Sequence, residues 1–153
     1  MAGKIDHIDR RILAAIQRDG GMSQRELAER VGLSQNACWR RLRNLEAQGI
    51  IAGRRTKLDR VALGKKLVVF TMLRTRRHSI EWLSTFRNHV TSIPDIVDFY
   101  RIGGDYDYMI KIVTDDMTSF DRVYQQLIGK IELDAVTSYF AMEAILEDRP
   151  IPL

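Results

Sequence analysis

The sequence predicts an α+β protein with a small helical domain first and a domain of mixed strands and helices second. Three observations carry this prediction. Basic residues are concentrated towards the N-terminus, three short helical patterns follow one another before residue 50, and strand and helix patterns alternate from residue 67 onward. A chain of 153 residues, 45% of them hydrophobic, has enough apolar side chains to build two small cores.

Charge is unevenly distributed along the chain. Residues 1–60 hold 13 Lys or Arg and 7 Asp or Glu, a net charge of +6. The totals of 24 and 20 leave 11 and 13 for residues 61–153, a net charge of −2. This asymmetry predicts that only the first domain meets a polyanion. The single cysteine cannot form an internal disulfide, and no stretch resembles a signal peptide or membrane span, so we expect a cytoplasmic protein.

Three helices are predicted before residue 50. Apolar residues recur at helical spacing from Ile5 to Ile16, and this first helix stops at a pair of glycines. Ser23 and Glu26 form a capping box in front of a short second helix. Ser34 is placed to cap a third helix over residues 35–48. A tri-helical unit of this size is therefore expected.

The next segment predicts a hairpin and then a linker. Residues 50–58 contain two short apolar or β-tolerant pieces around Gly53 and two arginines, which indicates a β-hairpin wing. Together with the three helices, this hairpin would complete a winged helix-turn-helix DNA-binding domain over residues 1–58. The polar residues 59–66, which include Gly64, are predicted to link the two domains.

The predicted third helix has two different faces. Cys38, Leu42 and Leu45 share an apolar face, and the opposite face is polar and cationic. A helix fits the major groove of DNA, where Arg can pair with guanine and Asn or Gln with adenine. The candidates for base contact are Gln35, Asn36, Trp39 and Arg40. The candidates for phosphate contact, which positions a protein without reading sequence, are Ser34, Arg43, Arg54, Arg55 and Lys57.

The second domain, residues 67–153, predicts a ferredoxin-like sandwich. Strand and helix patterns alternate in the order βαββαβ, over residues 67–74, 82–93, 96–102, 106–113, 120–131 and 136–142. In this fold two helices cover one face of a four-stranded antiparallel sheet. The first strand is apolar on both sides, at Val69, Phe70, Met72 and Leu73. We therefore expect dimerisation to bury the face that the helices leave open.

Four sequence blocks occur in the order and spacing of a known family. They are residues 8–13 (IDRRIL), 27–34 (LAERVGLS), 41–51 (RLRNLEAQGII) and 104–108 (GDYDY). On these blocks the chain resembles the Lrp/AsnC, or feast/famine, transcriptional regulators over essentially its full length. The resemblance implies a DNA-binding regulator that forms homodimers through its sheet, often assembled into octamers. Residues 131–134 (IELD) depart from the Leu-Pro-Gly-Val-like turn of many members.

The resemblance also implies an effector site for an amino acid. In relatives the effector binds between dimers, near the Gly-Asp-Tyr-Asp-Tyr loop and the last strand, which here correspond to Gly104, Asp105, Asp107, Tyr108, Tyr139 and Ala141. The chemistry agrees, because Asp105 and Asp107 could accept hydrogen bonds from an ammonium, and turn amides could donate to a carboxylate. The alternative is a plain hairpin in which Asp and Gly serve only the turn.

Two other classes of function compete with a regulator. A small enzyme on the second domain lacks a Ser/His/Asp arrangement, a phosphate-binding glycine loop and metal-ligand spacing among Cys38 and the histidines. We therefore expect no catalysis, no cofactor and no metal, with Cys38 and Met22 in the core. An architectural protein that compacts DNA without sequence preference stays an open alternative.

Overall fold

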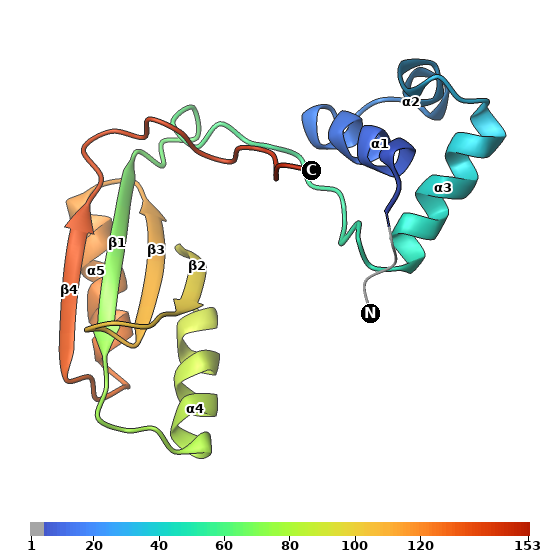
Figure 1. Ribbon diagram of the computed structural model, residues 1–153. Coiled ribbons are helices and arrows are strands. Elements are labelled where there is room, and N and C mark those ends of the chain that lie inside the picture. Colours follow the sequence, from blue (N-terminus) through green and yellow to red (C-terminus); the bar gives the residue numbers. More distant parts are fainter. Residues whose placement is uncertain (1–4) are drawn as a thin grey trace. The chain divides into compact units, whose positions relative to one another are not determined.

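The computed structural model describes residues 5–153, which divide into two compact units (Figure 1). The first unit comprises the chain up to Leu58 together with Leu146–Leu153, and the second comprises Asp59–Ile145. Residues 59–66, which the sequence suggests as a linker, thus belong to the second unit, and the C-terminal residues belong to the first. Within the described range, no helix is long and apolar enough to cross a lipid bilayer.

The first unit contains the three predicted helices, α1 (His7–Arg18), α2 (Gln24–Val31) and α3 (Gln35–Ala47). Each helix begins at a side chain that accepts a backbone N–H three residues further on, namely Asp6, Ser23 and Ser34. The capping box predicted between Ser23 and Glu26 is present. Because a cap satisfies backbone donors that the helix itself cannot, these short helices have well-defined starts.

The three helices share one core, and an arginine joins two of them at its edge. Ile12 of α1 and Leu45 of α3 are almost completely buried in this core. Beside it, Nη1 of Arg41 donates to a carboxylate oxygen of Asp6 at 2.7 Å and to one of Asp9 at 2.8 Å. Asp6 and Asp9 also form the capping box of α1. Arg41 therefore ties the first turn of α1 to the middle of α3.

The predicted β-hairpin wing is wrong, because residues 50–58 contain no strand. The N–H groups of Ile50 and Ile51 instead turn back to the carbonyl oxygen of Leu45, at 3.1 and 3.3 Å. The side chains of Ile50 and Ile51 pack against the helical core. A two-stranded hairpin is stable only when apolar side chains support its pairing. Here the side chains of Ile50 and Ile51 pack in the core, and the apolar residues that follow them, Ala52 and Leu58, are exposed.

The C-terminal residues of the chain contact α1 within the first unit. The side-chain amide of Gln17 donates through Nε2 to the carbonyl oxygen of Ile151 at 3.1 Å. It also accepts, through Oε1, the backbone N–H of Ile151 at 2.8 Å. Pro150 and Pro152, on either side of Ile151, favour an extended backbone. The Gln17 side chain thus hydrogen-bonds both the N–H and the carbonyl oxygen of Ile151, as the backbone of a neighbouring strand would.

The second unit has the predicted βαββαβ order. Its elements are β1 (Leu67–Arg74), α4 (Ile80–Thr91), β2 (Ile96–Arg101), β3 (Tyr108–Thr114), α5 (Met117–Ile128) and β4 (Ala135–Phe140). The strands form one antiparallel sheet in the order β2-β3-β1-β4. Both helices lie on the same face of this sheet (Figure 1). This arrangement confirms the predicted ferredoxin-like fold.

Alternate residues of each strand face the two helices and form the second core. Val69 and Leu73 of β1 and Ile110 of β3 are fully buried there. They pack with Phe86 of α4 and Leu127 of α5, which are also fully buried. Because side chains alternate along a strand, the residues between these core positions point to the opposite face of the sheet.

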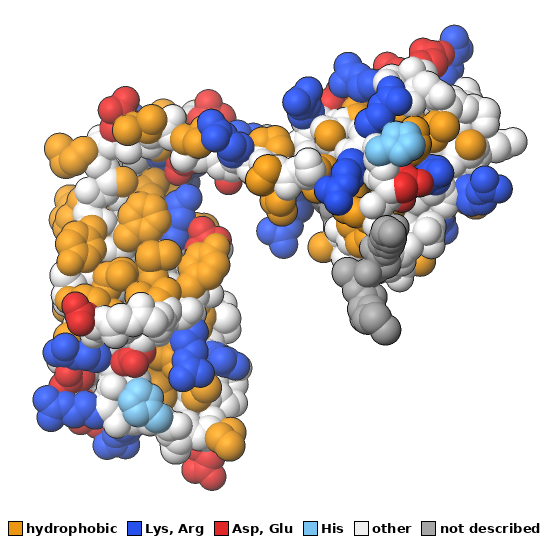
Figure 2. Space-filling model, viewed as in Figure 1, with side chains coloured by type: hydrophobic (Ala, Val, Ile, Leu, Met, Phe, Trp, Pro, Cys, Tyr) orange, Lys and Arg blue, Asp and Glu red, His pale blue; other side chains and the backbone are white. Residues whose placement is uncertain are grey.

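That opposite face is mainly apolar, although Lys111 and Thr137 also lie on it, and neither helix covers it. Tyr139 pairs across strands with Phe70, and Met109 pairs with both Met72 and Tyr100. Tyr139 is 56% exposed and Tyr100 is 52% exposed. Figure 2 shows hydrophobic side chains gathered over these strands. We call these five hydrophobic residues the free sheet face, and an exposed apolar patch of this kind is typical of an interaction surface.

We expect Arg41→Gln to lower the melting temperature, because two carboxylates at the start of α1 lose a charged donor. The backbone N–H of Asp9 and then the Arg41 guanidinium lower the pKa of Asp6. A carboxylate with a lowered folded-state pKa contributes stability above its ordinary value of 3.8 and loses it as the pH falls through the folded pKa. The deficit of the variant should therefore be present at neutral pH and shrink below pH 3.8.

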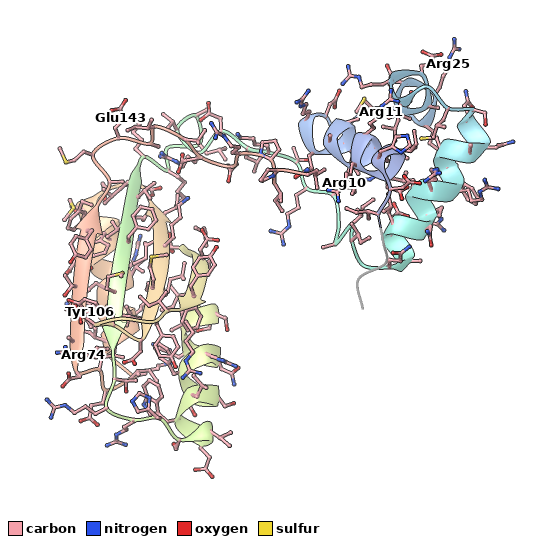
Figure 3. The ribbon with its side chains drawn as sticks, viewed as in Figure 1. Arg10, Arg11, Arg25, Arg74, Tyr106 and Glu143 are labelled. Atoms are coloured by element: carbon pink, nitrogen blue, oxygen red, sulfur yellow. The ribbon has the colours of Figure 1, made fainter. Side chains whose placement is uncertain are left out.

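The control for this measurement is Arg10→Gln. Arg10 is exposed on α1, where Figure 3 labels it, and it forms no ion pair within the described part of the chain. This variant removes the same charge and should leave the melting temperature nearly unchanged, in thermal unfolding followed by circular dichroism. An equal loss in both variants would show that Arg41 stabilises the fold only through the overall charge.

Candidate nucleic-acid interface and effector site

One face of α3 is exposed, polar and basic. Gln35, Asn36 and Arg40 are exposed, whereas Cys38 and Leu42 on the other side of the helix are buried. Among residues 5–153 Arg40 has no acidic partner. The side chains suggested for base contact therefore stand clear of their own domain, with a guanidinium available for an acceptor outside it.

A single carboxylate organises one edge of this face. Glu46 accepts Nη1 of Arg43 at 3.2 Å and lies 3.7 Å from Nη2 of Arg54. The guanidinium carbon of Arg43 also lies 5.9 Å from the ring centre of Trp39, which is 48% exposed. Stacking of this kind is weakly attractive at an exposed site. Glu46 thus lies beside two arginines proposed for phosphate contact, and one of them, Arg43, also lies over the Trp39 ring.

The remaining predicted DNA contacts come from the N-cap of α3 and from the irregular segment that follows the helix. The hydroxyl oxygen of Ser34 accepts the N–H of Ala37 at 3.3 Å, so its hydrogen is available to a phosphate oxygen. Arg55 and Lys57 are exposed in the segment that has no strand. Their positions follow the path of a loop rather than the arms of a hairpin.

Cys38 is a core residue, as the sequence suggests. It is 2% exposed, and burial raises the pKa of its thiol. Within residues 5–153 no cluster of three or more His, Cys, Asp or Glu side chains could hold a metal ion.

The β2–β3 loop contains an exposed carboxylate and a tethered one. Gly104 has φ +128°, a conformation that other residues rarely adopt. Asp105 is exposed and, in the part of the chain that is described, makes no hydrogen bond. Asp107 accepts the backbone N–H of Thr75 at 2.8 Å, and its own N–H donates to the carbonyl oxygen of Leu73 at 2.9 Å. Asp107 thus ties the loop to the end of β1.

Two further polar contacts surround this end of the sheet. The hydroxyls of Tyr106 and Thr137 lie 2.8 Å apart, and Nε of Arg74 donates to Asp134 at 2.8 Å. Figure 3 labels Tyr106 and Arg74 beside each other there. Sequence reasoning missed both residues, because their partners are 31 and 60 residues away and no local pattern signals the pairing.

The other suggested effector residues do not gather at the loop within one chain. Tyr108 is 4% exposed, and its ring packs against Phe86 and Phe99 in the core. Tyr139 stands on the free sheet face, opposite Phe70. Tyr108 is opposite Leu73, three residues further along β1, which places the two tyrosines about 10 Å apart along the strand. Ala141 lies beyond Tyr139 in the same direction.

Two family models match the chain. Residues 5–52 match a model described as winged helix-turn-helix DNA-binding. Residues 68–151 match a model described as the Lrp/AsnC ligand binding domain. The chain is also similar to a glutamate uptake regulatory protein from Zymomonas mobilis, with 39% identity over 100% of this chain and 93% of the relative. The DNA-binding transcriptional activator DecR from Escherichia coli is 39% identical over 97% of this chain and 99% of its own length.

Solved structures have the same fold. An AsnC family transcriptional regulator from Agrobacterium tumefaciens superposes with a TM-score of 0.94 and 42% identity, over 97% of each chain. A transcriptional regulator from Neisseria meningitidis, solved as a complex with L-Met, gives a TM-score of 0.92 and 27% identity, again over 97% of each chain. Both similarities cover the helical unit and the sheet unit together.

We expect Asp107→Ala to destabilise the second unit by about 1–2 kcal/mol, because a backbone N–H would lose its charged acceptor. That N–H belongs to Thr75, which is only 4% exposed, so water cannot easily replace the carboxylate. The measurement is the free energy of unfolding from urea titration.

Asp105→Ala is the matched control, since Asp105 is exposed in the same loop. We expect it to change the free energy of unfolding by less than about 0.5 kcal/mol. If the two variants were equally stable, the contact between Asp107 and Thr75 would not support the loop.

Proposed function

The chain belongs to the Lrp/AsnC family of transcriptional regulators, and from this premise we propose that it is a sequence-specific DNA-binding regulator whose DNA affinity or assembly responds to an amino acid. It acts by binding alone, without catalysis, and in the cytoplasm. The observation that carries the proposal is the exposed face of α3, on which Asn36 and Arg40 stand free of their own domain. The alternatives of an enzyme and of a sequence-independent DNA-compacting protein lack an observation that favours them.

The α3 face has the chemistry of direct base readout. An Arg guanidinium matches the two acceptors of guanine in the major groove, and an Asn or Gln amide matches adenine. Gln35, Asn36 and Arg40 lie in the first half of the helix, the part that reaches bases in helix-turn-helix proteins. Arg43 and Arg54, at the edge of the face, are suited to phosphates.

The free sheet face supports a homodimer. It combines exposed Tyr100 and Tyr139 with two methionines and Phe70, so pairing with a second copy would remove a large apolar surface from water. A dimer would present two α3 helices to successive major-groove faces, about 34 Å or a multiple apart, so its sites should be imperfect palindromes. We further propose that dimers assemble into octamers.

The effector site is completed by assembly in this proposal. In one chain Tyr108, just after the β2–β3 loop, lies about 10 Å along the strand from Tyr139 and on the other face of the sheet, so a small ligand that used both the loop and Tyr139 would need them from different copies. Asp105 offers an acceptor for the ammonium of the ligand, and backbone amides at Gly103 and Gly104 offer donors for its carboxylate. Binding there would alter DNA affinity only by favouring one assembly over another.

We expect Arg40→Ala to weaken binding to a duplex selected by the wild type from random DNA by roughly 10- to 100-fold, the range for loss of one bidentate base contact. Arg18→Ala is the control, because Arg18 is exposed on α1 and, among the residues described, forms no ion pair. Fluorescence anisotropy at fixed salt gives both affinities. Equal losses in the two variants, or equal affinity of the wild type for random DNA, would favour sequence-independent binding.

The effector is identified by a thermal-shift screen of the twenty amino acids, since a ligand of the folded state raises the melting temperature. We expect Asp105→Ala to lose the shift given by the best amino acid while it keeps wild-type DNA affinity. Arg40→Ala should keep the shift. A variant that lost both activities equally would contradict the separation of the two sites.

A further inference from the structure

A concave pocket of about 240 Å³ lies between α4 and the edge of the sheet. Its lining comes from Arg87 and Thr91 of α4, Phe99 and Arg101 of β2, and Tyr108 of β3. Arg87 and Thr91 are four residues apart and so share one side of their helix. Arg101 shares a face of β2 with Phe99, which packs on the core. The pocket therefore has two arginines at its rim and aromatic rings at its floor.

Both arginines are without an ion-pair partner among the residues that the structure describes. Arg87 and Arg101 are exposed, and neither forms an ion pair with any residue in the described range 5–153. An arginine on the helix-facing side of a strand is unusual, since that side otherwise carries apolar side chains and small hydroxyls here. A guanidinium is weakly hydrated and matches carboxylate geometry, so two of them around one hollow favour an anion.

The aromatic floor of the pocket determines which group the bound anion can have beside its charge. Phe99 is partly buried, and Tyr108 is only 4% exposed, with ring centres 5.7 Å apart. Such rings accept a flat apolar group by stacking or edge contact. The lining contains no carboxylate, so an ammonium would lie next to two cations without an anion to balance its charge. The pocket thus fits a small carboxylate with an apolar body and no ammonium, which distinguishes it from a site for a free amino acid.

We propose that this pocket is a second small-molecule site, for an aromatic or similarly flat carboxylate that carries no amino group. Arg101 and Tyr108 are paired across β2 and β3 and close the hairpin whose loop holds Gly104 and Asp105. A carboxylate held by Arg87 and Arg101 would link this hairpin to α4. If the proposed function holds, occupancy of the pocket would alter the affinity of the β2–β3 loop for the amino-acid effector. Binding of a carboxylate to the pocket itself does not depend on that function.

The test uses 3-phenylpropionate as the probe and isothermal titration calorimetry on the full chain. We expect the wild type to bind it, and Arg87→Gln and Arg101→Gln each to weaken binding by about tenfold or more, as for loss of a charged hydrogen bond. Arg122→Gln, at an exposed arginine of α5 outside the pocket, should bind like the wild type. 2-Phenylethylamine, which has the same ring and the opposite charge, should not bind.

Three outcomes would overturn the proposal: no binding by the wild type, equal binding by all three arginine variants and the wild type, or equal binding of the amine. Melting temperatures of the variants show that each is folded. Asp105→Ala separates this site from the loop site, because it should keep 3-phenylpropionate while losing the amino acid. DNA affinity measured without ligand tests the regulator itself, so failure of the pocket and failure of the proposed function give different results.

Discussion

The rotation of α3 about its own axis decides what this protein can present to DNA. Cys38, Leu42 and Leu45 anchor one side of the helix in the core, but an apolar stripe alone allows some rolling. The contact of Arg41 with Asp6 and Asp9 adds a directional constraint, because hydrogen bonds to two carboxylates have preferred geometry. The same two carboxylates cap α1. One small group of charges therefore sets where α1 begins and which side of α3 faces outward.

The sheet unit likewise has one face that packs in the core and one face that is exposed to partners. Two helices bury one side of the sheet, and the other side keeps aromatic and methionine side chains at its surface. Because strand residues alternate, a shift of register by one residue would exchange the two faces. The hydroxyl contact between Thr71 and Ser138 at 2.9 Å, within the covered face, gives the β1–β4 pairing a polar marker of register. Both units thus combine a well-packed side with one that is available to partners.

Local chemistry explains which features of the fold were predictable. Helix starts depend on a side chain and a backbone N–H three residues apart, so Ser23, Glu26 and Ser34 could be interpreted from sequence. The order of strands and helices along the second unit was predictable in the same way, from the alternation of strand and helix patterns. The prediction of a hairpin at residues 50–58 was wrong because strand pairing needs apolar side chains to pack against it. The side chains of Ile50 and Ile51 pack against the helical core instead.

The sites were less predictable than the fold, because they depend on contacts between residues far apart in the sequence. The exposed face of α3 follows from helical periodicity, so Asn36 and Arg40 could be placed without a structure. The roles of the two aspartates in the β2–β3 loop could not be distinguished from the sequence. Only the folded structure shows that Asp107 accepts the backbone N–H of Thr75 and that Asp105 is exposed. Arg87 and Arg101 meet through tertiary packing, and no spacing in the sequence connects them.

The contact of Gln17 with Ile151 has a consequence for dissecting the molecule. Because Leu146–Leu153 belong to the helical unit, the polypeptide passes between the units twice, after Leu58 and after Ile145. A protease nick after Leu58 would leave the three helices attached only through non-covalent contacts such as that of Gln17 with Ile151, whereas a nick after Ile145 would leave them covalently joined to the sheet unit. A recombinant fragment that stopped at Leu58 would lack the segment held by Gln17, so a faithful isolated helical unit would need its last eight residues supplied as a peptide or by circular permutation.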